Sequence, residues 1–116
     1  MSVSRLLRLE GLAAFLASLL LFAQASGTWW IFILFFLAPD LSMLGYLANP
    51  RLGSVIYNLV HNYLLVILLF AVGSFVASDA LRIASIILLG HIGMDRVLGF
   101  GLKYPTAFKD THLQRV

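Results

Sequence analysis

Long apolar runs with few polar interruptions dominate this chain. Residues 11–39 contain no charged side chain. Residues 52–78 contain no Asp, Glu, Lys or Arg, and His61 is their single histidine. A helix that crosses a bilayer needs about 20 apolar residues, so the first run predicts two helices joined by a turn at residues 24–28. The whole pattern predicts four helices, at residues 6–25, 29–48, 52–77 and 79–102.

Short polar breaks separate these predicted helices. The Asn-Pro-Arg sequence at residues 49–51 divides the second helix from the third, and Asp79 is the expected N-cap of the fourth. Residues 1–102 are therefore expected to form a transmembrane domain, and residues 103–116 a polar cytoplasmic tail on its surface. A cleaved signal peptide is the alternative interpretation of the first helix, and Glu10 at the entrance to the apolar stretch argues against it.

The composition excludes most soluble classes of protein. Hydrophobic residues make up 61% of the 116 residues and charged residues 11%, whereas a soluble domain carries about 25% charge. The net charge of +3 is spread along an apolar chain, which excludes a nucleic-acid-binding domain. The lack of cysteine rules out disulfides, thiolate-bound zinc and iron–sulfur clusters. The sequence thus predicts an all-α membrane protein, an antiparallel bundle of four transmembrane helices in contact with membrane lipid.

Basic residues predict the orientation of this bundle. With four spans, both termini and the loop at residues 49–51 share one side of the membrane. Seven basic residues fall on that side, namely Arg5, Arg8, Arg51, Arg96, Lys103, Lys109 and Arg115. Only Arg82 falls on the other side. Because cytoplasmic loops are enriched in Lys and Arg, both termini are expected in the cytoplasm.

Ionisable side chains of the predicted helices gather at one depth. At a rise of about 1.5 Å per residue, Asp40, His61, His91 and Asp95 lie about 9–15 Å from the cytoplasmic ends of their helices, and Glu10 about 7 Å. His91 and Asp95 are four residues apart and share one helix face. Because an ionisable side chain in lipid requires a partner, these residues are expected to meet in one polar site.

This donor set is typical of a divalent metal site. Two imidazoles with carboxylates and no sulfur favour zinc, manganese or iron. His61, His91 and Asp95 are the expected ligands, and Asp40 or Glu10 is a further ligand or the catalytic base. A metal ion beside lipid would activate water for the hydrolysis of a lipid ester or phosphoester.

Further polar residues surround the predicted site. Asn58 and Asn62 flank His61 at helical spacing and are expected to bind substrate, together with Arg96, which would hold an anionic head group. His112 would add a third imidazole to the metal if the tail folded back over the site as a lid. A solvated histidine in the tail is the alternative.

Three other interpretations fit the same residues. The polar side chains could form a clasp that holds a non-catalytic bundle together, or a His–Asp pair could act as a general base without metal. A homo-oligomer could instead use the polar layer as a path for a small solute, an ion or a proton. Apart from the surface pair Asp79 and Arg82, the outer half of the predicted bundle holds no ionisable residue that would continue such a path, which argues against a transporter made by a single chain.

Six short motifs resemble one known family. They are RLEG at residues 8–11, LAPDLSMLGY at 37–46, YNLVH at 57–61, HIGMDR at 91–96, GFGLKY at 99–104 and DTHL at 110–113. In this order, over nearly the whole chain, they resemble the small bacterial membrane proteins grouped as domain of unknown function 4260. The resemblance implies a multi-pass protein of the bacterial inner membrane and places the candidate residues other than Asn62 within the family's motifs. A looser likeness, through Pro39-Asp40 and Thr111-His112, is to membrane-bound metal-dependent hydrolases.

Overall fold

The computed structural model describes residues 2–106 and 109–116, so residues 107 and 108 of the predicted tail lie outside the described residues. Helices account for nearly all of the regular structure in this part of the chain. They are α1 (Val3–Ala25), α2 (Trp29–Phe35), the 3₁₀ helix η1 (Ala38–Leu47), α3 (Pro50–Val60), α4 (Tyr63–Phe75) and α5 (Asp79–Leu98). The all-helical fold class predicted from the sequence is confirmed.

Side-chain caps explain where several of these helices begin. Ser2, Asn49, Asn62 and Ser78 each accept a hydrogen bond from the backbone N–H three residues further on, which satisfies one of the free donors at a helix start. The predicted cap of α5 is therefore wrong by one residue, because Ser78 and not Asp79 makes this contact. The other end of α5 also differs from the prediction, since Gly99 adopts a left-handed conformation (φ +96°) that ends the helix at Leu98.

The second predicted helix is broken beside Pro39. Residues 29–48 form α2, a short break and η1 rather than one α-helix. Proline has no N–H to donate to the carbonyl of the residue four positions earlier, so the regular α-helical bonding stops at Phe35. Asp40 follows directly in the first turn of η1. The break beside Asp40 therefore takes the form of a change of helix type.

The third predicted helix is also two helices. Residues 52–77 were expected to be continuous, but α3 ends at Val60, α4 begins at Tyr63, and the two are bent by 43°. The Asn62 side chain holds the bend, because its oxygen accepts from the Leu65 N–H while its amide donates to the Asn58 carbonyl at 2.7 Å. His61 occupies the break itself.

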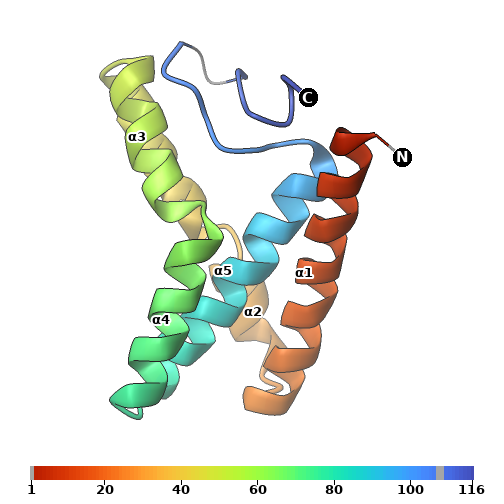
Figure 1. Cartoon of the computed structure of the whole chain (residues 1–116). Coiled ribbons are helices and arrows are strands. Elements are labelled where there is room, and N and C mark those ends of the chain that lie inside the picture. The colour runs from red at the N-terminus through yellow and green to blue at the C-terminus, as the bar shows by residue number, and fades with distance from the viewer. Residues whose placement is uncertain (1, 107–108) are drawn as a thin grey trace.

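Helix α5 lies at the centre of the packing. It packs against α1 and α4, while η1 packs against α3 (Figure 1). The contact with α1 is close, since a Cβ atom on Gly93 would lie 2.5 Å from the Gly11 carbonyl oxygen and one on Gly90 would lie 2.5 Å from the Ser18 hydroxyl. Small residues of this kind let membrane helices approach backbone to backbone.

Much of the helical surface is apolar and exposed. Within residues 2–106 and 109–116, two segments are long and apolar enough to cross a membrane, Val3–Ala25 and Trp29–Leu47, and the bent pair α3–α4 would be a third. Exposed leucines along α1, such as Leu16 and Leu20, fit a lipid-facing surface. These helices suggest a membrane protein. The N- and C-termini lie at the same end of the molecule (Figure 1).

Candidate metal centre

Four ionisable side chains from three parts of the chain converge near the middle of the fold. Asp40 comes from η1, His61 from the break between α3 and α4, and His91 and Asp95 from α5. One possible ligand atom from each side chain lies within 4.8 Å of the other three. We refer to these four residues as the Asp/His cluster. The sequence prediction that they meet in one polar site is thus matched by their positions in the structure.

The distances within the cluster have the size of a tetrahedral metal site. The Asp40 Oδ1 atom lies 3.3 Å from His61 Nε2 and 3.0 Å from His91 Nε2, and these two nitrogens are 3.2 Å apart. The Asp95 Oδ2 atom lies 3.3 Å from His91 Nε2 and 3.9 Å from His61 Nε2. Four ligands at about 2.0–2.1 Å from a tetrahedral zinc ion would be about 3.3 Å from one another. The cluster therefore has room for one such ion.

Hydrogen bonds on the far sides of the two imidazoles orient the rings. His61 Nδ1 lies 2.9 Å from the Tyr57 carbonyl oxygen, and His91 Nδ1 lies 2.7 Å from the Phe36 carbonyl oxygen. Because a carbonyl only accepts, we infer that each Nδ1 carries its proton and donates it. Each Nε2 then directs a lone pair at the cluster. Metal-bound histidines are oriented in the same way, by a second hydrogen bond to a carbonyl or a carboxylate.

Access to the cluster differs among its four residues. The side chains of His61 and His91 are almost fully buried, whereas the side chain of Asp95 is 15% exposed and that of Asp40 is 31% exposed. Asp40 is therefore the most accessible group of the cluster.

Tyr57 is a member of the site that the sequence analysis missed. Its ring stacks on the His61 imidazole with centroids 3.7 Å apart and planes 5° apart, and its hydroxyl donates to Asp95 Oδ2 at 3.2 Å. Ser42 also approaches, with Oγ 3.4 Å from His61 Nδ1. Tyr57 lies one helical turn before His61 in the YNLVH motif, and this spacing was the available signal.

Arg96 is buried beside the cluster and contacts backbone oxygens. Its guanidinium donates to the carbonyl of Phe100 at 3.0 Å and to that of His61 at 3.4 Å. The residue thus connects α5 with the break that carries His61. Contact of Arg96 with an anionic head group remains a prediction.

The two asparagines expected to bind substrate contact the backbone instead. Asn58 donates to the Lys103 carbonyl at 2.8 Å and accepts from the Lys103 N–H at 2.7 Å, which attaches the C-terminal segment to α3. Asn62 caps α4. Substrate binding by the two asparagines stays a prediction. Their observed contacts hold α3, α4 and the C-terminal segment together around His61.

The C-terminal segment folds back over the molecule. An antiparallel bridge joins Lys103 to Thr111, and Lys103, Thr111 and Leu113 are buried, while other described residues of the segment are exposed or half-buried. The Lys103 ammonium lies 4.7 Å from the centre of the Tyr57 ring, so the segment reaches the edge of the cluster. Figure 1 shows it running from the end of α5 across to the side of α3.

Two further candidate residues lie outside the cluster. His112 Nδ1 accepts a hydrogen bond from the Leu102 N–H at 2.8 Å, within the folded C-terminal segment. Glu10 is exposed on α1. Within the described part of the chain, neither belongs to the group of side chains that could hold a metal ion.

Charge contacts stabilise the folded C-terminal segment. Arg115 donates two hydrogen bonds to the Asp110 carboxylate, at 2.9 and 2.6 Å, and Thr106 donates a third. These bonds, those from Arg115 above all, lower the pKa of Asp110 to about 2. The pKa of His112 is also lowered, chiefly by burial and further by the positive charge of Arg96.

The lowered pKa of His112 predicts that acid loosens this segment. Neutral His112 accepts the Leu102 N–H bond, and protonation removes that acceptor. Since the folded pKa lies below the unfolded value of 6.5, the stabilisation is complete above about pH 6.5 and is lost as the pH falls further. Hydrogen exchange at the Leu102 amide, corrected for its intrinsic pH dependence, should show less protection at pH 5 than at pH 7.5. In His112→Asn, whose amide oxygen accepts at both pH values, protection should be independent of pH, and an unchanged pH response would contradict this assignment.

Comparisons with known proteins give one match. Residues 4–116 match a family model described as Domain of unknown function (DUF4260). Searches of curated proteins and of solved structures found no match, so the looser likeness to metal-dependent hydrolases stays a prediction. The family match covers nearly the whole chain and includes every residue of the Asp/His cluster. The chain therefore belongs to the DUF4260 family.

Proposed function

We propose that this protein is a membrane-embedded, metal-dependent hydrolase whose divalent ion is held by the Asp/His cluster. The observation that carries the proposal is the convergence of two imidazole Nε2 atoms and two carboxylates at 3.0–3.9 Å from one another. With their Nδ1 protons donated to backbone carbonyls, the two neutral imidazoles would direct their Nε2 lone pairs at the carboxylates. A divalent cation at the centre would remove the repulsion among these groups.

The donor set limits the identity of the ion. Two imidazole nitrogens and two carboxylate oxygens, without sulfur, suit zinc, manganese or iron(II). The two negative charges of Asp40 and Asp95 match the charge of one divalent ion, which matters among buried groups. The ligand separations of 3.0–3.9 Å include the value of about 3.3 Å expected around a tetrahedral zinc ion.

Asp40 supports a hydrolytic role over a purely structural one. A structural zinc site is closed by four protein ligands, whereas a catalytic one keeps a position for water. Asp40 is the most accessible of the four side chains. When bound, the metal would lower the pKa of a coordinated water and polarise a carbonyl or phosphoryl oxygen. His61, His91 and Asp95 would hold the ion and leave its fourth position to water. Asp40 would take the proton of the attacking water, and cleavage of the ester would yield an acid and an alcohol.

We propose that the chain crosses a membrane four times and has both termini in the cytoplasm. The segments α1, α2–η1 and α3–α4 supply the apolar spans, and α5 would be the fourth, with Asp95 and Arg96 largely buried against the rest of the fold. The positions of both termini at one end of the molecule support this topology (Figure 1). The excess of basic residues at that end supports the cytoplasmic side, in a bacterial inner membrane.

Metal analysis and a hydrolysis assay test the two parts of this proposal. The full chain, purified in detergent and loaded separately with zinc, manganese or iron(II), should retain about one ion per chain after dialysis. Asp95→Asn should retain less, while Asp110→Asn, which alters a carboxylate outside the cluster, should match the wild type. In vesicles, the loaded protein should release fatty acid or phosphate from lipid, and chelation should stop the release. Wild-type protein without metal would overturn the whole proposal, and metal without hydrolysis would overturn the enzymatic part.

A further inference from the structure

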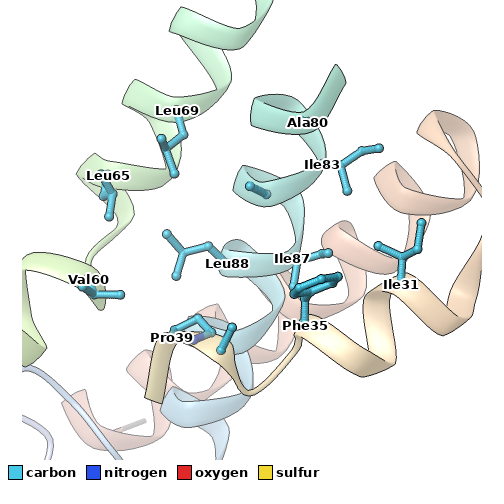
Figure 2. Close-up of a pocket in the computed structure, with 12 residues that line it drawn as sticks. Ile31, Phe35, Pro39, Val60, Leu65, Leu69, Ala80, Ile83, Ile87 and Leu88 are labelled. Carbon is cyan, nitrogen blue, oxygen red and sulfur yellow. The ribbon is translucent and has the colours of Figure 1, made fainter. Parts of the chain in front are cut away.

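An apolar groove leads away from the Asp/His cluster between α2–η1 and α4, with α5 as its floor (Figure 2). It encloses about 620 Å³, within the range of roughly 300–1,000 Å³ in which proteins bind small ligands. All the side chains that line it are apolar. The buried residues Ile87 and Leu88 form its floor, while Phe35, Ala80 and Ala84 form an exposed rim.

One end of the groove lies at the cluster. Pro39 and Val60 line that end, and they are the chain neighbours of Asp40 and His61. Ile87 precedes His91 by one helical turn, so it occupies the same face of α5. Figure 2 shows the lining side chains extending from Pro39 and Val60 toward Ala80 and Ile83 at the other end.

The length of the groove matches one acyl chain. From Ala80 to His91, α5 rises about 16 Å, and one leaflet of the hydrocarbon core is about 15 Å thick. Charged side chains flank both ends, the Asp/His cluster beside Pro39 and Val60 and the Asp79–Arg82 ion pair beside Ala80 and Ile83. A lipid whose ester met the Asp/His cluster would have only apolar side chains along the groove to contact its acyl chain.

We infer that this groove holds one acyl chain of a membrane lipid and presents the polar end of that lipid to the Asp/His cluster. The inference rests on the proposed function, because it names the substrate class of the same site as an acyl lipid. Within a bilayer, burial of the acyl chain supplies little driving force, since the surrounding lipid is equally apolar. Selectivity therefore comes from the fit of the groove and from the polar group held at the cluster.

Photocrosslinking in vesicles tests this position. Two phosphatidylethanolamine probes carry a diazirine in the acyl chain, one near the ester and one near the methyl end. The ester-side probe should label residues beside Pro39 and Val60, and the methyl-side probe should label residues beside Ala80 and Ile83. Leu64, an exposed leucine of α4 outside the groove, reports labelling by bulk lipid.

A variant that fills the groove provides the control. Ala84→Phe places a phenyl ring over the groove, so labelling inside it should be lost while labelling at Leu64 persists. Ala80→Phe at the far end should remove the methyl-side labelling alone, and it replaces Ala84→Phe if that variant fails to fold. Labelling with the opposite polarity, labelling that survives both variants, or crosslinks from the groove to a second copy of the chain would each overturn the inference.

Metal content, measured on the same samples, separates this inference from the proposed function. Ala84→Phe leaves the Asp/His cluster unchanged and should bind metal as the wild type does. If the wild type binds metal but does not give the expected labelling pattern, the acyl-chain site is wrong and the metal site still stands. If the groove is labelled as expected but the wild type binds no metal, the proposed hydrolase function is wrong and the lipid site still stands.

Discussion

Replacing His91 with alanine should weaken metal binding by roughly 100-fold or more, since loss of a hydrogen-bonding partner behind a ligand already costs about 10–100-fold. His91 Nε2 is central to the cluster, at 3.0 Å from Asp40 and 3.3 Å from Asp95. Without it, two carboxylates and one imidazole remain, and the Phe36 carbonyl loses its donor. Titration of metal-free protein with zinc, followed by calorimetry or a competing chelator, measures the change.

His112→Ala is the matched control for this loss. It also removes one imidazole, but His112 bonds to the Leu102 N–H in the C-terminal segment rather than to the cluster. Zinc affinity should therefore stay within a fewfold of the wild type. If both variants lost affinity equally, His112 would be a ligand, as the lid interpretation of the sequence proposed, and the four-residue assignment would need revision.

The helices could be predicted from the sequence because apolar runs and helix caps are local signals. Pro39 is also a local signal, because a proline interrupts the hydrogen bonding of an α-helix. The bend at His61 was missed because no glycine or proline stands there. Asn62 ends α3 through hydrogen bonds from its own side chain to the backbone. Asparagine does so only when the surrounding packing favours the turn, and that packing is not visible in a local pattern.

The cluster could be predicted because its members share a depth in the bundle and ionisable groups in lipid need partners. Its surroundings depend on contacts between distant segments. Tyr57 reaches Asp95 across 38 positions, and Asn58 reaches Lys103 across 45. The first contact requires α3 to pack against α5, and the second requires the folded C-terminal segment. Arg96 was expected to face a ligand, but a buried guanidinium is satisfied equally well by backbone carbonyls that a helix break leaves free.

Replacing Arg96 with methionine should lower the free energy of unfolding by about 2–4 kcal/mol, because it leaves the carbonyls of His61 and Phe100 without their donor in a buried region. Methionine keeps most of the aliphatic length of arginine, so the packing of this side chain against Gly11 of α1 is largely preserved. The loss thus isolates the guanidinium. Thermal unfolding in detergent, followed by circular dichroism, measures it.

Arg82→Met is the control on the same helix. Arg82 forms an ion pair with the exposed Asp79, and such pairs contribute about 0–1 kcal/mol, so this variant should unfold close to the wild-type temperature. Arg96→Met should also weaken zinc binding, because His61 loses the contact that holds its backbone in the break. The head-group interpretation makes the opposite prediction. If Arg96 instead served an anionic lipid, Arg96→Met would retain its stability and its zinc affinity and would lose only the preference for anionic over neutral vesicles.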